Sequence, residues 1–295
     1  MWRAGYYIFY GINRIITLLP LGILYVFSDI LFLFLYYYPS YRRQIVAENL
    51  TRSFPEKSAE EIRQIEKAFY RHLSDLFIEV LKLPGMSKKE LLRRVKLNNP
   101  ELIKPFYESG KDIALVYSHY NNWEWLTTVF PLFTAYKCVG AYKPVKNKIV
   151  NKFLNDQRTR YKADPAPMQM VLRRIIENRK KGIRAMYGFI SDQTPARALI
   201  EYYTDFLNQE TPVFLGLEKI ATKYNMAVLF MDIRKIRRGF YEVTLDVLFE
   251  NTKGLPKYLI TDTHVKRLEK TIMEKPEYWI WTHRRWKYKK EPENA

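Results

Sequence analysis

Hydrophobic and polar positions beyond residue 100 alternate between helical periodicity and short apolar runs. This alternation is typical of an α/β sheet, in which each run is a strand and helices connect them. The runs are Ile113–Tyr117, Lys137–Ala141, Ile183–Ile190 and Ala227–Ile233. After Arg237-Arg238-Gly239, the stretch Phe240–Phe249 alternates apolar with polar residues, which predicts an antiparallel hairpin. We therefore expect a mixed, mostly parallel central sheet flanked by helices.

The N-terminal pattern is different, because it is apolar almost without interruption from Ile15 to Tyr38. Its length suits the roughly 20 residues of a membrane-spanning helix, and Asp29 is its only charge. Pro20 and Gly22 interrupt it, so a buried core helix is the competing interpretation. We expect residues 1–40 to form a membrane-anchoring helical segment and residues 41–295 to form one domain. Spanning and monotopic insertion both remain open.

A long amphipathic helix is predicted from Ser58 to Leu83, beginning with a capping box formed by Ser58 and Glu61. His72, Asp75 and Glu79 lie near one another on this helix. They form either a polar cluster beside a functional site or a solvated helix edge. In the absence of other evidence we favour the solvated edge.

The composition narrows the choice of partner. The net charge of +18 predicts an anionic partner, and no zinc-finger, RNA-binding or basic-helix motif supports nucleic acid. An anionic membrane surface and an acidic protein remain as possible classes of partner. The alternating aromatic and basic residues of 279–290 are expected to lie against such a membrane. One cysteine, Cys138, excludes an intrachain disulfide, and four scattered histidines give no zinc-like spacing, so we expect neither metal nor cofactor.

Two histidines are followed five positions later by a glutamate, which is the pattern of a general base and its orienting carboxylate. One pair is His119 and Glu124, and the other is His264 and Glu269. His264 lies in a lysine-rich segment with helical periodicity, where a solvated histidine is the simpler interpretation. His119 directly follows an apolar strand, and open α/β sheets bind ligands at the carboxyl ends of their strands. We therefore choose His119.

The spacing also constrains the local structure. Residues five apart on a straight helix do not share a face, so His119 must lie in a loop that precedes the helix. Asn121 or Asn122 is then the N-cap residue. If Asn121 is the cap, Glu124 completes a capping box, which is an alternative role for that glutamate. We prefer an orienting role, in which Glu124 reaches back to His119.

Several motifs, in this order, resemble those of the late acyltransferases of lipid A biosynthesis, within the larger group of His-x4-Asp/Glu glycerolipid acyltransferases. An entry segment runs from Tyr41-Arg42-Arg43 through Glu48-Asn49-Leu50 to Phe54-Pro55-Glu56, and the Ser118–Glu124 signature follows. The other matching elements are Tyr142-Lys143-Pro144, Arg158-x-Arg160, Ser191-Asp192-Gln193 and the ending Glu277–Lys287. The resemblance covers nearly the whole chain and is to a Bacteroidetes-like member. Lys143 departs from the usual Arg, and Phe206-Leu207-Asn208 from a common Phe-Phe-Gly turn.

This resemblance implies a membrane-bound enzyme on the cytoplasmic side of the bacterial inner membrane. It would transfer a fatty acyl chain from acyl carrier protein to a hydroxyl of an anionic glycolipid, the lipid A precursor. His119 would be the base and Glu124 its orienter, and the expected oxyanion or substrate-binding residues are Arg158, Asp192, Asn122 and Arg160. An amino-acid lipid or a glycerolipid is the alternative acceptor. A membrane lipid-binding scaffold without chemistry is the alternative outside enzymes.

Overall fold

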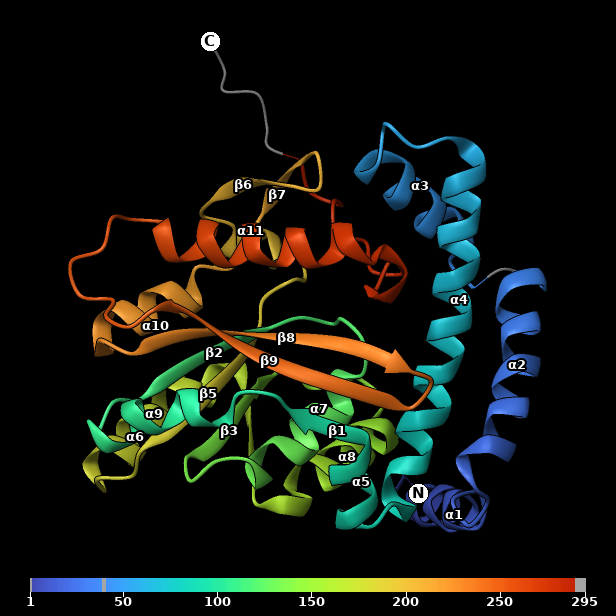
Figure 1. Ribbon diagram of the computed structural model, residues 1–295, viewed down its shortest axis with the longest axis horizontal. Coiled ribbons are helices and arrows are strands. Elements are labelled where there is room, and N and C mark those ends of the chain that lie inside the picture. The colour runs from blue at the N-terminus through green and yellow to red at the C-terminus, as the bar shows by residue number, and fades with distance from the viewer. Residues whose placement is uncertain (1, 39–40, 290–295) are drawn as a thin grey trace.

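A seven-stranded sheet forms the centre of the computed structural model, which describes residues 2–38 and 41–289 (Figure 1). The strands lie in the order β1-β9-β8-β2-β5-β3-β4, and β8 and β9 are the only antiparallel neighbours in this sheet. The expected mixed, mostly parallel sheet is confirmed. Its strands are β1 (Val95–Leu97), β2 (Ile113–Tyr117), β3 (Lys137–Tyr142), β4 (Asp164–Pro167), β5 (Ala185–Ile190), β8 (Ala227–Arg237) and β9 (Phe240–Phe249).

Helices cover both faces of this sheet, and a small antiparallel ribbon made of β6 (Tyr203–Phe206) and β7 (Gln209–Pro212) lies outside it (Figure 1). Side chains alternate between the two faces of a strand. As a result, Ala114 and Val116 of β2 join one core cluster, whereas Ile113, Leu115 and Tyr117 join the other. The first cluster receives residues of α9 (Val171–Lys180), α10 (Gly216–Tyr224) and α11 (Leu259–Glu274), and the second receives residues of α5 (Lys88–Arg94) and α7 (Trp123–Val129). The remaining helices are α1 (Trp2–Ile16), α2 (Leu21–Tyr37), α3 (Arg43–Ser53), α4 (Ala59–Lys82), α6 (Lys104–Glu108) and α8 (Lys148–Arg158).

The N-terminal segment forms two helices, α1 and α2, which are separated by residues 17–20 and bent by 116°, and most of the apolar stretch from Ile15 lies in α2. Among the described residues no single helix is long and apolar enough to cross a membrane, and only this bent pair meets that criterion jointly. The inner side of α2 is fastened to the domain by polar contacts: Tyr25 donates to Glu79 and Ser28 to Asp75. Its outer side exposes a run of large apolar side chains, namely Ile23, Val26, Phe27, Ile30, Leu33 and Phe34.

Helix α4 begins with the expected capping box of Ser58 and Glu61. The expected solvated edge, however, is wrong, because His72, Asp75 and Glu79 are all buried. Helix α2 and the β8–β9 hairpin cover this side of α4, where Arg238 donates two hydrogen bonds to Asp75. The cluster is therefore the polar seam between the N-terminal helices and the sheet.

Two expectations for the C-terminal third are also wrong. His264 is 2% exposed rather than solvated, because Ile260, His264, Leu268 and Ile272 recur every four residues on the buried side of α11. Within the 279–290 stretch, of which residues up to 289 are described, Trp279 and Trp281 pack inside the first core cluster instead of lying on a surface.

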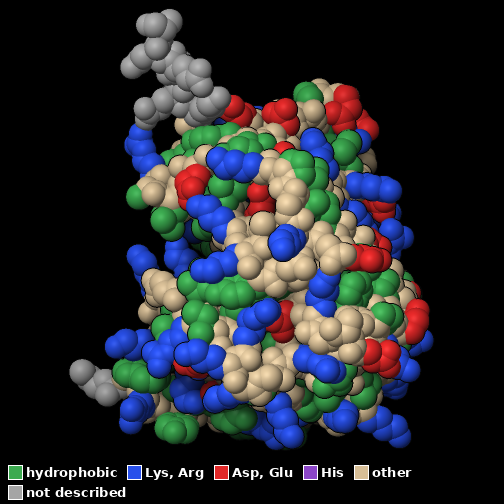
Figure 2. All heavy atoms as spheres, turned by 90° about the vertical axis from the view of Figure 1, so that its left-hand side faces the viewer, with side chains coloured by type: hydrophobic (Ala, Val, Ile, Leu, Met, Phe, Trp, Pro, Cys, Tyr) green, Lys and Arg blue, Asp and Glu red, His purple; other side chains and the backbone are tan. Residues whose placement is uncertain are grey.

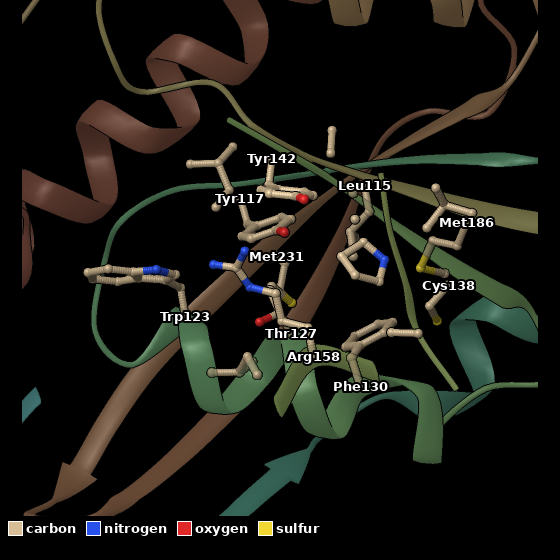
Figure 3. A pocket seen from close by; sticks show the side chains of 18 residues that line it. Leu115, Tyr117, Trp123, Thr127, Phe130, Cys138, Tyr142, Arg158, Met186 and Met231 are labelled. Carbon is tan, nitrogen blue, oxygen red and sulfur yellow. The ribbon is translucent and has the colours of Figure 1, made fainter. Parts of the chain in front are cut away.

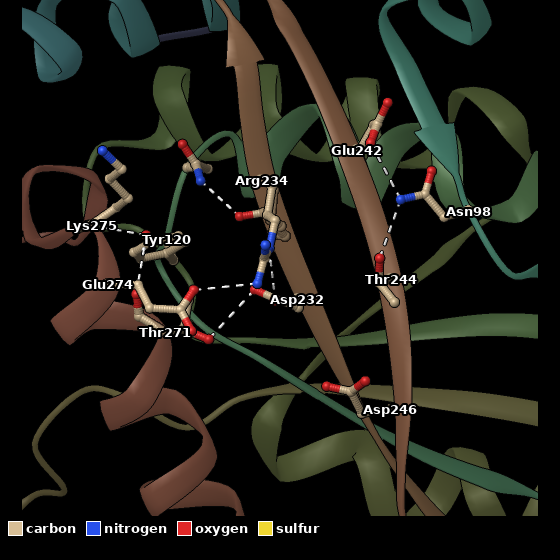
Figure 4. Close-up of polar contacts among 12 residues, drawn as sticks. Asn98, Tyr120, Asp232, Arg234, Glu242, Thr244, Asp246, Thr271, Glu274 and Lys275 are labelled. Carbon is tan, nitrogen blue, oxygen red and sulfur yellow. Dashed lines mark hydrogen bonds and ion pairs between the residues drawn. The ribbon is translucent and has the colours of Figure 1, made fainter.

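The end of α11 is fixed to the loop after β2. Tyr120, in that loop, donates a hydrogen bond of 2.9 Å to the carbonyl oxygen of Lys275 (Figure 4). Thr271 donates to Asp232 of β8 in the same region (Figure 4). Backbone pairing of Tyr120 with Trp279 continues this attachment. The C-terminal segment consequently forms one wall of the loop that carries His119.

Candidate active site

Two neighbouring parallel strands, β2 and β5, bring His119 and Asp192 together. In their register Tyr117 pairs with Ile190, so each of the two polar residues lies two positions beyond a paired strand end. Both strands are nearly completely buried, which fixes their register against slippage. The site therefore lies at the carboxyl edge of the sheet, as expected for His119.

Asp192 is the hydrogen-bond partner of the His119 ring. Its Oδ1 lies 2.8 Å from Nδ1 of His119, and its Oδ2 accepts the backbone N–H of His119 at 2.9 Å and the indole N–H of Trp279 at 2.8 Å. Burial alone would raise the pKa of the Asp192 carboxyl. The charge of His119 and these three hydrogen bonds outweigh burial, so the pKa lies below its usual value. An ionised Asp192 thus holds the proton of His119 on Nδ1 and leaves Nε2 as the basic nitrogen.

The His119 side chain is partly accessible, and the neighbours of its second nitrogen are side chains of two other residues. The His119 side chain is 19% exposed, and the side-chain amide nitrogen of Gln193 lies 3.3 Å from Nε2. The ring of Trp123 meets the imidazole edge to face, with 5.0 Å between the ring centroids. His119 is therefore oriented from behind by Asp192 and flanked by Gln193 and Trp123.

The expectation that Glu124 orients His119 requires a correction. Glu124 binds Arg158 through two hydrogen bonds, of 3.1 Å from Nε and 2.6 Å from Nη2, and no hydrogen bond joins it to His119 in the described structure. The reason is local: Glu124 points toward α8, where a guanidinium provides a bidentate partner. Burial would lower the pKa of Arg158, but the Glu124 carboxylate outweighs it and raises that pKa.

The loop between His119 and α7 is built by its two asparagines. Asn121 adopts a left-handed backbone, with φ of 53°, and its side chain donates to the carbonyl oxygen of Ile233 at 2.7 Å. Asn122 is the N-cap of α7, because its Oδ1 accepts the N–H of Trp125 at 2.9 Å. Its Nδ2 donates to the buried Glu79 at 2.6 Å.

Two further residues of the expected site make contacts within the protein. Asn122 uses both ends of its amide there, and its expected part in substrate binding stays a prediction. Arg160, also expected to bind substrate or an oxyanion, donates to the carbonyl oxygens of Leu83 and Met86 at 2.9 and 2.5 Å. It therefore fastens the turn after α8 to the end of α4. Arg158 is the member of the Arg-x-Arg pair that faces the cavity described next.

An apolar cavity with an empty volume of about 650 Å³, counting its open mouth, lies on the face of the sheet that packs against α7 (Figure 3). Trp123, Tyr142 and Arg158 lie toward one end of it, and Cys138 and Met186 lie toward the other (Figure 3). Because Trp123 also contacts His119, the cavity begins beside the imidazole. A hydrocarbon chain held in this cavity would have the functional group at its end beside His119.

Reasoning from residue spacing assigned no role to Gln193, Trp279 or His283, which were noted only within the family motifs. Gln193 contacts the His119 ring and Trp279 supports Asp192. Burial lowers the pKa of His283 to about 4, so it is neutral at physiological pH beside Asp192 and His119. Position along the chain is the signal that indicates Gln193, because Asp192 and Gln193 follow an apolar strand just as His119 does.

Among residues 2–38 and 41–289, no group of three or more His, Cys, Asp or Glu side chains is arranged to hold a metal ion. A comparison of the sequence with family models gives a match to the bacterial lipid A biosynthesis acyltransferases over residues 2–288. No curated protein matches the chain significantly.

Proposed function

Because the chain belongs to the family of bacterial lipid A biosynthesis acyltransferases, we propose that this acyltransferase moves a fatty acyl chain from acyl carrier protein to a hydroxyl of a lipid A precursor. The observation that carries the proposal is the pairing of His119 with Asp192 at the mouth of an apolar cavity. A base beside a lipid-binding cavity is what acylation of a hydroxyl by a fatty acyl thioester requires.

In the proposed reaction, Nε2 of His119 takes the proton of the acceptor hydroxyl while its oxygen attacks the thioester carbonyl carbon. The tetrahedral intermediate then expels the thiolate as the C–S bond breaks, and the imidazolium returns its proton to that sulfur. Asp192 stabilises the imidazolium between these steps without itself taking the proton. General-base catalysis of this kind contributes about 10²–10⁴-fold in rate.

Arg158 is our candidate for stabilising the negative oxygen of the intermediate. Its Nε and Nη2 are held by Glu124, and Nη1 has no hydrogen-bond partner in the described part of the chain. The Arg158 side chain also lines the cavity. A guanidinium that is already held in place loses little free energy in reorganisation when charge develops nearby. Glu124 then contributes by positioning Arg158 and not by orienting His119.

The donor would approach over the loop that follows β3. Lys143, Lys146 and Lys148 are exposed there, and no acidic residue occurs between Lys143 and Asn155. Tyr142, the last residue of β3, lines the cavity, so this basic loop adjoins the cavity mouth. Lys and Arg side chains are also widespread over the face seen in Figure 2. Acyl carrier protein is acidic, and such a surface would accelerate its encounter.

We also propose that α1 and α2 anchor the enzyme in one leaflet, on the cytoplasmic side of the inner membrane. Helix α2 has 17 residues, about 25 Å, which is shorter than the roughly 30 Å hydrocarbon core. Its inner side is bound to α4 through Tyr25 and Ser28, whereas its outer side is apolar. A helix held along its length by a water-soluble domain is suited to lying in the interface and unsuited to crossing the bilayer.

The test is acyl transfer from acyl carrier protein thioesters to a lipid A precursor in mixed micelles, followed by mass spectrometry. The wild type should transfer, and His119→Ala should lose at least about 10²-fold. Gln64→Ala, an exposed change on α4, serves as the matched control. Transfer by His119→Ala at near the wild-type rate would refute the proposal. An amino-acid lipid and a glycerolipid are tested in parallel, and preference for either would replace the proposed acceptor.

A further inference from the structure

The apolar cavity is floored by alternate residues of three strands. Side chains of β2, β3 and β5 that point to the α7 side line it, and these include Leu115, Cys138 and Met186. Two positions on this floor carry no side chain, namely Gly140 on β3 and Gly188 on β5. They are directly paired in the parallel register of the two strands.

The backbone does not require glycine at either position, because neither has a positive φ. Their surroundings explain them instead. A Cβ at Gly140 would meet no atom within 4 Å, whereas one at Gly188 would lie 3.0 Å from Cε1 of Tyr117. Gly140 therefore leaves empty space in the middle of the cavity, and Gly188 leaves room for the Tyr117 ring. Paired glycines in adjacent strands allow another molecule to approach the sheet closely.

Cys138 lies at the far end of the cavity and also lines a second one. That second cavity has an empty volume of about 1200 Å³, is more open and contains Lys137, Lys162 and Arg184. Cys138 is thus the wall between an apolar cavity and a basic, solvent-facing one. A hydrocarbon chain that passed this wall would leave apolar surroundings for charged ones, which disfavours it.

The length of the apolar part can be estimated from the strands. Tyr142 at the mouth and Cys138 at the wall are four residues apart on β3, which is about 13 Å. An extended chain advances about 1.2 Å per bond, since three backbone bonds span 3.3–3.6 Å. The cavity therefore holds about eleven bonds, which join about twelve carbons.

We propose that Cys138 and Gly140 set the acyl-chain length of this enzyme, with Cys138 as the terminal wall and Gly140 as the open floor, for saturated chains of about twelve carbons. This inference rests on the proposed function, because it assigns the cavity to the acyl group of the donor. It adds the length of that group and the two residues that determine it.

A chemical test uses the fact that Cys138 is the only cysteine of the chain. Burial raises the pKa of its thiol to about 12, so alkylation by N-ethylmaleimide at pH 8 should be slow enough to follow by intact-protein mass. The His119→Ala variant is incubated with octanoyl, dodecanoyl or tetradecanoyl thioesters of acyl carrier protein. Alkylation should slow at least about fivefold with the two longer chains and be unchanged with octanoyl. Equal protection by all three would overturn the assignment.

A second test measures selectivity in the active enzyme with donors of eight to sixteen carbons. Gly140→Leu and Cys138→Phe should shift the preferred chain by at least two carbons toward shorter donors, and Cys138→Ala should shift it toward longer ones. Gly216→Leu, where a Cβ also meets nothing within 4 Å but which is exposed at the start of α10, should change nothing.

The two tests separate the inference from the proposed function. If the wild type transfers acyl groups but none of the cavity variants changes its chain-length preference, the inference is refuted and the proposed function is not. A wild type that transfers none to any acceptor would refute the proposed function. Opposite shifts from two substitutions at the same residue, Cys138, exclude loss of folding as their cause.

Discussion

Replacing Asp192 by Asn tests which carboxylate orients His119. Oδ2 of Asp192 accepts two N–H groups, from the His119 backbone and from Trp279, and Oδ1 faces Nδ1 of the imidazole. An asparagine must place its single oxygen toward the two N–H donors. In the opposite orientation its NH₂ group, itself a donor, would face both of them. Its NH₂ then faces Nδ1, which has to become the acceptor. The ring proton moves to Nε2, where the base must act.

The expected loss follows from this change of tautomer. The wrong tautomer removes most of the general-base contribution and the stabilisation of the imidazolium, about 10³–10⁴-fold in kcat/KM. At about 1.36 kcal/mol per tenfold, this loss corresponds to roughly 4–5.5 kcal/mol of transition-state stabilisation. Binding of the donor should change little, because the cavity does not include Asp192. The loss should therefore appear in kcat and not in KM.

The assay is transfer from dodecanoyl acyl carrier protein to the precursor at pH 7.5, with kcat and KM determined for both substrates. Asp205→Asn, the same substitution at an exposed position of β6, is the matched control. Asp192 has a lowered pKa, so it stabilises the fold above about pH 4, and this contribution is lost as the pH falls through its folded pKa. Rates are therefore normalised to folded protein. A kcat within threefold of the wild type would refute the orienting role of Asp192.

Further predictions concern Arg158, a buried histidine and the N-terminal helices. Glu124→Gln should lower kcat only about tenfold, because one hydrogen bond to Arg158 remains; a loss larger than that of Asp192→Asn would restore Glu124 as the orienter of His119. Burial lowers the pKa of His264 to about 4, so its protonation in the unfolded state should reduce the free energy of unfolding by about 3 kcal/mol between pH 6.5 and pH 4. His264→Leu should lose less stability than the wild type over this range in urea titrations, and identical pH dependence would contradict the burial argument. Phe27→Ser with Phe34→Ser should reduce flotation with anionic vesicles at least tenfold, since each ring is at least half exposed on α2. Met273→Ser, an exposed change on α11, should leave flotation unchanged.

The sheet could largely be predicted from the sequence because its central strands are buried on both faces. β2, β5 and the first seven residues of β8 are apolar runs of this kind, and β9 shows the alternation of a strand with one covered face. β3 is apolar as well but only partly buried. The short strands β1 and β4 could not be found in this way. β4 reads Asp-Pro-Ala-Pro, a composition that disfavours strands, and it forms only at the sheet edge.

The contact of His119 with Asp192 could not be predicted because spacing along the chain describes only local neighbours. Glu124 is five residues from His119, whereas Asp192 is 73 residues away and becomes adjacent only through the pairing of β2 with β5. Strand order and register are tertiary properties that a single sequence does not reveal. Glu124 also had a competitor for its carboxylate, Arg158, whose position depends on the packing of α8 near α7.

The burial of Trp279, Trp281 and Arg285 near the C-terminus has a similar origin. Alternating aromatic and basic residues suit a membrane surface. A large ring is nevertheless stabilised more by burial in a packed core when its polar atom has a hydrogen-bond partner there. Trp279 donates to Asp192, and Trp281 donates to the carbonyl oxygen of Pro276 at 2.6 Å. Arg285 is buried as well and donates to the carbonyl oxygen of Pro212. Burial lowers its pKa to about 10, so it stays charged at physiological pH.

One carboxylate links the N-terminal helices to the loop that carries His119. Glu79 is fully buried, and its carboxylate accepts hydrogen bonds from Tyr25 of α2, Tyr241 of β9 and Asn122 of the loop. Burial raises the pKa of Glu79, although these donors partly oppose it. Detaching α2 would remove one donor from a carboxylate that has no access to water, at a cost of about 1–3 kcal/mol or more. Helix α2 and the N-cap of α7 are therefore held by one side chain, and displacement of α2 would loosen the loop that carries His119.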